Sequence, residues 1–300
     1  MAKSLIIGGA SGYTWDHLKY WVNSIKRSGY TGDIAIVATN ISKETIDKLA
    51  SEDVNVQVYG QQQPDGSFKA NSQGAPHVER FFYIWNYLKD RFFQYDYVIT
   101  TDTRDVVFQT DPTEVLDSYL NENNPRLIAS SEGLRYEDEP WGNQNLLEAF
   151  GPYFHNIYKS GTIYNVGTIA GYSRTVTDLL FLIFQMSINR PIPIVDQAVY
   201  NILLNQDPIE SMTHFSDNRD RWAIQLGTTL EAVKSGKGDL GMRYGTTPSQ
   251  HIVYQTMYDD IQPVFLDGYV LNDKGEKYCI VHQYDRTVEW KDKIMEKYND

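Results

Sequence analysis

Two aspartates follow the end of a hydrophobic segment in the middle of the chain. Residues 97–101 are apolar or β-branched and predict a buried strand, which runs directly into Asp102, with Asp105 three positions later. Carboxylates at this spacing at a strand end can converge on a hard cation such as Mn²⁺ or Mg²⁺. Arg104 lies between them and could instead form a turn-fixing ion pair with one aspartate. Both interpretations are open for the isolated motif.

Three later segments carry polar side chains where a site could form. The triplet Asn-Val-Gly at 165–167 lies within a predicted strand, Asp196 and Gln197 begin a predicted short helix, and His282 follows Val281 late in the chain. Each has an ordinary structural explanation, since an aspartate caps helices and a strand histidine is commonly hydrogen-bonded. The order of these segments along the chain, after the two aspartates, is however more specific than any one of them alone.

Alternating strand and helix patterns surround these residues. Strand patterns occur at residues 5–9, 33–39, 54–59 and 97–101, and helix patterns begin after Thr14 and cover 42–49, 77–93 and 111–120. This alternation predicts an α/β fold with a mainly parallel sheet flanked by helices. Because open α/β sheets bind ligands beyond the carboxyl ends of their strands, the residues that follow the strands are candidates for chemistry.

The second half of the chain is more irregular. We expect a strand at 126–130, a polar, acidic loop at 132–145, a strand at 162–170 and a helix at 175–188. Short β patterns dominate from residue 212 onward, including a hairpin across 272–275. No internal repeat, low-complexity segment or break in composition marks a linker, so a single domain over 1–300 is expected.

Charge and composition exclude several classes of protein. Lys plus Arg number 27 and Asp plus Glu 39, giving a net charge of −12, which disfavours binding to nucleic acid or an anionic membrane. A phosphorylated ligand therefore needs a metal or placed cations. The single cysteine, Cys279, excludes an intramolecular disulfide and a cysteine-rich zinc site. No stretch approaches the roughly 20 apolar residues of a membrane span, and the N-terminal apolar run is too short for a signal peptide, so a cytoplasmic protein is expected.

The segment containing the two aspartates resembles the Asp-x-Asp region of metal-dependent nucleotide-sugar glycosyltransferases with the GT-A fold. The usual motif has its carboxylates two positions apart, whereas here it is stretched from Asp102 to Asp105. The later motifs also follow the order found in glycogenin-like members of this class. The resemblance implies a GT-A-type, Rossmann-like domain in which residues 1–125 form the nucleotide-binding half and 126–300 the acceptor-binding half.

The same resemblance implies which residues meet the metal and the donor. His282 joins Asp102 and Asp105 around Mn²⁺ or Mg²⁺, which stabilises the growing negative charge of a departing nucleoside diphosphate. A UDP-sugar is favoured as donor, with Tyr13 stacking on its base and Ser11 meeting its ribose. The expected donor contacts are Gly9, Ala10, Ser11, Tyr13, Arg80, Asp102, Thr103, Arg104, Asn165, Gly167, Gln197 and Arg286.

Two arginines in that set are chosen for their chemistry. The guanidinium groups of Arg80 and Arg286 match the geometry of phosphate oxygens, although solvated or structural ion-pair roles would explain each of them equally well.

The expected reaction transfers the sugar to a hydroxyl of a glycan or another acceptor. Asp196 is the expected catalytic residue, either as the general base of an inverting reaction or as an orienting group in a retaining one. Trp141 offers an aromatic face to an acceptor sugar, and Glu132 is a further expected acceptor contact. Rival acidic contacts border the same predicted loop at Glu137, Asp138 and Glu139.

A dehydrogenase is an alternative from another class. Residues 5–12 resemble the opening of a short-chain dehydrogenase, whose glycines let the backbone approach a dinucleotide. Thr14 stands where a further glycine is expected, Asn40 stands where an acidic ribose ligand is expected, and no tyrosine lies four positions before a lysine. All three departures weaken this interpretation.

Two alternatives share more of the pattern. A nucleotidyltransferase would show a glycine- and arginine-rich triphosphate loop, but residues 8–13 contain no basic side chain. A carbohydrate-binding or scaffold protein could keep the GT-A fold without activity. The presence of Asp102, Asp105 and His282 together argues against such a scaffold.

Overall fold

Seven strands form the central sheet of the protein, for which a computed structural model describes residues 2–236 and 261–299. The strand order is β10-β8-β9-β6-β1-β2-β3, and of these seven only β9 runs antiparallel to its neighbours. The bounds are Ser4–Ser11 for β1, Asp33–Thr39 for β2, Asn55–Val58 for β3, Tyr97–Thr101 for β6, Leu127–Arg135 for β8, Thr162–Tyr172 for β9 and Thr213–Ser216 for β10. The mainly parallel α/β sheet predicted from the sequence is confirmed.

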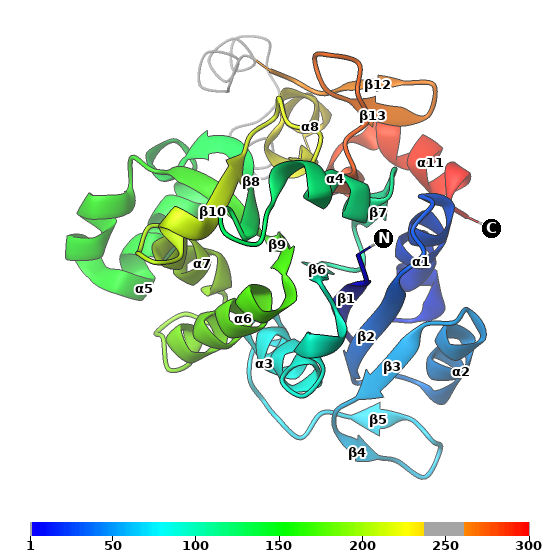
Figure 1. Ribbon diagram of the computed structural model, residues 1–300. Helices are drawn as coiled ribbons and strands as arrows, with labels where there is room; N and C mark the ends of the chain where they lie inside the picture. Colours follow the sequence, from blue (N-terminus) through cyan, green and yellow to red (C-terminus); the bar gives the residue numbers. More distant parts are fainter. Residues whose placement is uncertain (1, 237–260, 300) are drawn as a thin grey trace.

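Helices cover both faces of this sheet (Figure 1). Alternate residues of β1 point to opposite sides, so Leu5 and Ile7 belong to one core while Ile6 belongs to the other. The first core is shared with α3 (Pro76–Leu88), α6 (Ser173–Ser187) and α7 (Asp196–Leu204). The second is shared with α1 (Trp15–Arg27), α2 (Lys43–Ser51) and α4 (Pro112–Tyr119). As expected, Thr14 caps α1.

A smaller sheet stands beside the end of the central one. It contains β11 (Ala223–Gln225), β14 (Ile280–His282) and β7 (Val106–Phe108), with β14 in the middle, parallel to β11 and antiparallel to β7. Its own core includes Val107, Ile224 and Val281, over which α11 (Val288–Lys297) packs Trp290. Because β7 follows β6 after only four residues, the chain passes directly from one sheet into the other.

Apart from one long helix at Pro140–Tyr158, the remaining described elements are short. They are β4 (Gln61–Gln62), β5 (Phe68–Lys69), α8 (Leu230–Ser235), β12 (Val264–Leu266), β13 (Tyr269–Leu271) and five 3₁₀ turns at Phe92–Gln94, Tyr136–Asp138, Glu210–Met212, Leu226–Thr228 and Tyr284–Arg286. The turn predicted at 272–275 is present, closed by the Gly275 amide donating to the Asn272 carbonyl at 3.1 Å. A bridge between Leu271 and Lys277 follows it.

The prediction of a loop at 132–145 is wrong over most of its length. Strand β8 continues to Arg135, and a long helix, α5, spans Pro140–Tyr158 with an interruption at Gly151. The Glu139 carboxylate caps this helix by accepting hydrogen bonds from the amides of Trp141 and Gly142. Proline at the first helical position also suits a helix start.

Two further differences from the expected elements are smaller. The helix expected at 77–93 ends at Leu88, and the polar segment before it contains the β4–β5 pair.

Among the helices of the described residues, none combines the length and apolar character needed to cross a membrane.

Candidate functional site

A cavity of about 590 Å³ opens where the central sheet meets the smaller sheet. Apart from the rival acids Glu137 and Asp138, every residue that the sequence singled out for a ligand, metal or catalytic role lines it, although these residues come from both halves of the chain. They are Gly9, Ala10, Ser11, Tyr13, Arg80, Asp102, Thr103, Arg104, Asp105, Glu132, Glu139, Trp141, Asn165, Gly167, Asp196, Gln197, His282 and Arg286. The structure therefore brings the scattered motifs to one place.

The two aspartates lie in the bend between β6 and β7. The Asp102 amide donates to the Gly167 carbonyl at 3.0 Å, which ties the bend to β9. On the other side of the bend, the Gln283 amide donates to the Asp105 carbonyl at 2.7 Å. Arg104 Nη2 lies 3.5 Å from Asp105 Oδ2 and 3.6 Å from Asp285 Oδ2, so the ion pair considered from the sequence is present as well. It leaves the other Asp105 oxygen, Oδ1, facing His282.

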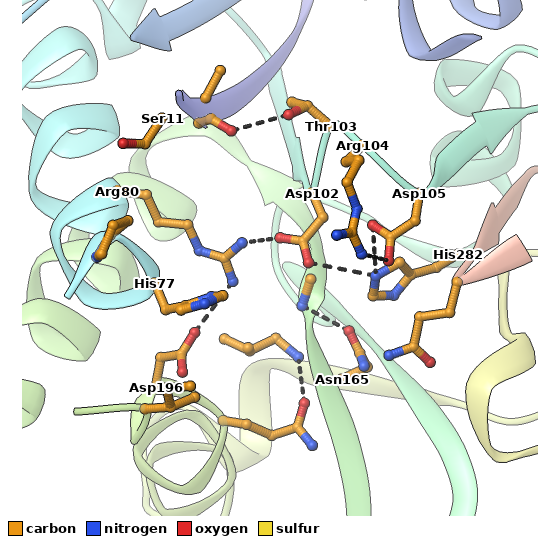
Figure 2. Close-up of a pocket in the computed structure, with 18 of the residues that line it drawn as sticks. Ser11, His77, Arg80, Asp102, Thr103, Arg104, Asp105, Asn165, Asp196 and His282 are labelled. Carbon is orange, nitrogen blue, oxygen red and sulfur yellow. Dashed lines mark hydrogen bonds and ion pairs between the residues drawn. The ribbon is translucent and has the colours of Figure 1, made fainter. Parts of the chain in front are cut away.

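His282 reaches the aspartates because of strand register. It is the last residue of β14 and pairs with Val106, the residue directly after Asp105. His282 Nε2 lies 3.4 Å from Asp102 Oδ2 and 3.8 Å from Asp105 Oδ1 (Figure 2). One ligand atom from each of the three residues lies within 4.8 Å of the others, close enough to hold one metal ion.

Gly167 leaves the space beside this cluster open. A Cβ at this position would lie 2.6 Å from His282 Cε1 and 3.0 Å from Asp102 Oδ2, so a larger residue would press on two of the three side chains. The position of the glycine thus fits a cluster that must stay open to a further atom. Two carboxylate oxygens and an imidazole nitrogen are also a donor set that a divalent cation can use.

Burial favours the neutral form of His282. Desolvation is the largest influence on this ring and lowers its pKa below the ordinary value, although the Asp105 carboxylate acts in the opposite direction. Its Nδ1 is 2.6 Å from Gln225 Oε1. The neutral ring has a lone pair that it could give to a cation, whereas a protonated imidazole has none.

The end of β1 and the loop after it form the neighbouring wall. A Cβ on Gly8 would lie 2.2 Å from Thr103 Cγ2, and one on Gly9 would lie 2.9 Å from Arg80 Cβ. Thr103 Oγ1 donates to the Gly9 carbonyl at 3.0 Å. These glycines therefore let Thr103 and Arg80 approach the strand, which explains them without the dinucleotide of a dehydrogenase. Tyr13, at the end of the loop, stacks on His17 with ring centroids 5.5 Å apart.

Arg80 connects the metal-side aspartate to the residue expected to act on the sugar. Its Nη1 donates to Asp102 Oδ1 and its Nη2 donates to Asp196 Oδ2, the latter at 3.2 Å (Figure 2). Arg80 lies on α3, whereas Asp196 is the first residue of α7 and is almost fully buried. The guanidinium thus holds two carboxylates from separate elements.

The far wall carries the side-chain amides of Asn165 and Gln197 together with the expected acceptor residues. Asn165 Nδ2 donates to Glu132 Oε1 at 2.6 Å, and Asn165 Oδ1 accepts from the Gly167 amide at 2.7 Å. Gln197 Oε1 accepts a long hydrogen bond from the Val166 amide. Trp141 lines the cavity from the first turn of α5.

The rival acids of this region have structural contacts, although Glu139 also lines the cavity. Glu139 caps α5, and Glu137 and Asp138 pair with Arg135 at 3.2 and 2.9 Å. Their contacts therefore distinguish them from Glu132, which accepts from Asn165 inside the cavity.

Sequence analysis did not single out three polar residues in or directly behind the site, His77, Gln283 and Gln225. His77 lines the cavity from α3, and its position one helical turn before Arg80 could have revealed it. Gln283 also lines the cavity and adopts a left-handed backbone, with φ of 57°, directly after His282. Gln225 lies behind the cluster and contacts His282, but no sequence spacing links these two distant positions.

Comparisons with known proteins add information on the fold. No protein-family model and no curated protein sequence matches this chain. Among solved structures, the chain is similar to the apo structure of WbbM, described as a bifunctional glycosyltransferase, with a TM-score of 0.53 and 11% sequence identity. The match covers all of this chain and 52% of that chain, so this chain spans about half of that protein's length. The α/β fold therefore resembles that of a glycosyltransferase.

Proposed function

We propose that this protein is a metal-dependent glycosyltransferase of the GT-A type, which moves a sugar from a nucleotide-sugar donor to a hydroxyl of a glycan or another acceptor. The observation that carries the proposal is the convergence of Asp102, Asp105 and His282 within a cavity of suitable size. The likeness of the fold to a glycosyltransferase supports it. A UDP-sugar remains the favoured donor by resemblance.

Asp102, Asp105 and His282 would hold Mn²⁺ or Mg²⁺. Bound there, the cation would neutralise charge on the diphosphate leaving group as the glycosidic bond breaks. The stretched motif is compatible with this role, because the bend between β6 and β7 turns both carboxylates toward His282. Gly167 leaves room beside them.

The donor would lie along the wall formed by Gly9, Ala10, Ser11, Tyr13 and Thr103. In this proposal Tyr13 contacts the base and Ser11 the ribose, while Arg104 and Arg286 face the diphosphate from the opposite side. These cations matter because the chain carries a net charge of −12, which otherwise repels a phosphorylated ligand.

Asp196, Asn165 and Gln197 would face the donor sugar. Asp196 already accepts a hydrogen bond from Arg80, which holds its carboxylate in a fixed orientation at the start of α7. We therefore propose that Asp196 orients the sugar through hydrogen bonds. Arg80 fixes the distance between that carboxylate and the metal-side Asp102.

Trp141 and Glu132 would form the acceptor side of the cavity. The Trp141 ring can pack on the apolar face of a sugar, and Glu132 can accept a hydrogen bond from an acceptor hydroxyl. Because Asn165 donates to Glu132, the acceptor carboxylate is connected to the residues that face the donor sugar.

Release of UDP from a panel of UDP-hexoses and UDP-pentoses in the presence of Mn²⁺ tests the proposal. We expect slow donor hydrolysis that stops with EDTA and is lost in His282→Ala. The corresponding GDP-sugars serve as the comparison for the base. Hydrolysis that continues unchanged in EDTA and in His282→Ala would contradict a metal-dependent transferase.

A further inference from the structure

A chain of buried hydrogen bonds lies behind the metal-binding cluster. It runs from the Ala223 carbonyl through the Ser130 hydroxyl and the Gln225 side-chain amide to His282. The Ser130, Gln225 and His282 side chains belong to residues that are at most 2% exposed. Each donor and acceptor in this chain must therefore find its partner within the protein.

The direction of these hydrogen bonds is determined at the Ala223 end. A backbone carbonyl can only accept, so the Ser130 hydroxyl donates its single proton to Ala223 O at 3.0 Å. Ser130 Oγ must then accept from the next group, which places Gln225 Nε2 toward it at 3.0 Å. Gln225 Nε2 lies equally close to Thr168 Oγ1. The amide oxygen of Gln225 consequently faces His282.

This direction decides which nitrogen of His282 carries the proton. Gln225 Oε1 can only accept, so His282 Nδ1 must donate across the 2.6 Å that separates them. In a neutral imidazole one nitrogen carries the proton and the other has a lone pair. His282 Nε2 therefore presents its lone pair toward Asp102 and Asp105.

The opposite tautomer would close the site. A proton on Nε2 would point toward Asp102 Oδ2 at 3.4 Å and Asp105 Oδ1 at 3.8 Å, where either carboxylate could accept it. The histidine would then satisfy the carboxylates itself and would have no lone pair for a cation. Nothing in the cluster other than the partner of Nδ1 prevents this arrangement.

Strand register explains why Gln225 occupies this position. Gln225 and His282 are direct neighbours on the parallel strands β11 and β14, and each is the last residue of its strand. Directly paired residues project to the same face of a sheet, so their side chains meet. The smaller sheet thus places the metal-facing histidine and its partner together.

We propose that Gln225 is a positioning residue which, with Ser130 behind it, holds His282 in the Nδ1-protonated tautomer and so makes Nε2 available to the metal. This inference rests on the metal site of the proposed function. Gln225 does not line the cavity and acts through His282 alone. Partners of this kind behind a metal-bound histidine commonly change metal affinity by about 10- to 100-fold.

The tautomer can be measured without any metal. Long-range ¹H–¹⁵N correlation spectra of ¹⁵N-histidine-labelled protein distinguish protonated from bare ring nitrogens, and His282→Ala identifies the signal among the six histidines. We expect Nδ1 to carry the proton in the wild-type protein and Nε2 to carry it in Gln225→Leu. A wild-type spectrum with the proton on Nε2 would overturn the proposal, even if Gln225→Leu does not fold.

Calorimetric titration of Mn²⁺ tests the consequence for binding. We expect Gln225→Leu to lose at least about tenfold in Mn²⁺ affinity. Gln225→Glu retains an acceptor for Nδ1, so we expect its Mn²⁺ affinity to lie within about threefold of that of the wild type. A purely structural role of Gln225 would not explain such a difference between the two variants. Equal affinities for the wild type and Gln225→Leu would overturn the proposal.

Gln109→Leu is the matched control. Gln109 is also a buried glutamine whose amide bonds to backbone groups, namely the Val270 and Tyr278 carbonyls, but it has no contact with the cluster. It should lose stability while keeping wild-type Mn²⁺ affinity. Failure of the wild-type protein to bind Mn²⁺ would contradict the proposed function, whereas a wild type that binds Mn²⁺ with the proton on Nε2 would contradict only the role of Gln225.

Discussion

The proposed metal side and the proposed acceptor side of the cavity are built in different ways. Asp102, Asp105 and His282 stand at the ends of strands from two sheets, where backbone pairing determines their spacing. On the acceptor side, Glu132 also belongs to a strand, β8, but Trp141 stands at the start of helix α5. Ile194, which lines the cavity from the segment before α7, is 38% exposed. Asn145 Nδ2 donates to the Ile194 carbonyl at 2.6 Å, which ties helix α5 to the segment before α7.

This difference indicates how tolerance to change is distributed across the site. A cluster that must hold a cation needs positions fixed to a fraction of an ångström, and strand register supplies them. A surface that receives an acceptor can be formed by helix ends and connecting segments, where side chains can be exchanged without moving a sheet. Substitutions on the metal side should therefore have larger effects than substitutions on the acceptor side.

Removal of a metal ligand should have the largest effect. His282→Ala deletes one of the three converging ligand atoms and Asp105→Asn replaces a charged carboxylate ligand by a neutral amide, and we expect losses of more than about a hundredfold in Mn²⁺ affinity. Calorimetry with Mn²⁺ measures the loss. Asp285→Asn is the matched control, since Asp285 shares Arg104 with Asp105 but is not one of the converging ligands. An equal loss in that control would mean that the Arg104 ion pairs matter more than ligation.

Filling the space beside the cluster should have the next largest effect. In Gly167→Ala the new Cβ would meet His282 and Asp102, so we expect roughly a 10- to 100-fold loss of Mn²⁺ affinity while the fold is retained. Gly161→Ala, near the start of the same strand, is the control because its Cβ would contact only the Tyr158 carbonyl, at 3.1 Å. Wild-type affinity in Gly167→Ala would show that the cluster is less tightly positioned than the structure indicates.

Asp196→Asn should affect turnover and leave the metal side intact. The substitution keeps the size of the side chain but removes the charge that pairs with Arg80. We expect donor hydrolysis to fall about tenfold or more, with UDP affinity in Mn²⁺ within about twofold of the wild type. Comparison of hydrolysis rates with calorimetric UDP affinities separates the two effects. Unchanged turnover would reduce Asp196 to a helix-start residue.

Trp141→Ala should have the smallest effect on the metal and donor. We expect UDP binding in Mn²⁺ to match the wild type, while the KM for a saccharide acceptor rises about three- to tenfold through loss of the aromatic face. Steady-state kinetics with varied acceptor concentration measure the change. A loss of UDP affinity comparable to that of Gly167→Ala would remove the distinction between the two sides.

The first half of the fold follows from local patterns in the sequence. Alternating apolar segments predict β1, β2 and β6, and the same strand ends predict where Asp102 lies. Helix α5 was not predicted, because Gly142, Gly151 and Pro152 interrupt the helical pattern and the acidic residues before it suggest a loop. Its cap is formed by Glu139, one of those acidic residues.

The sequence predicted which residues belong to the candidate site, but it did not predict how their side chains are arranged. Ordered motifs brought Asp102, Asn165, Asp196 and His282 together without revealing the contacts between them. The pairing of His282 with Gln225 depends on two three-residue strands that are far apart in the chain. Such short strands have no periodicity that could indicate their register.

Calorimetric titration of UDP into the wild-type protein, with Mn²⁺ and then with EDTA, tests the central claim most directly. The account predicts UDP binding that requires Mn²⁺ and disappears in His282→Ala, with GDP as the comparison for the base. Binding of GDP instead would keep the metal site and change the donor. Absence of Mn²⁺-dependent binding of either nucleotide would contradict a metal-dependent glycosyltransferase.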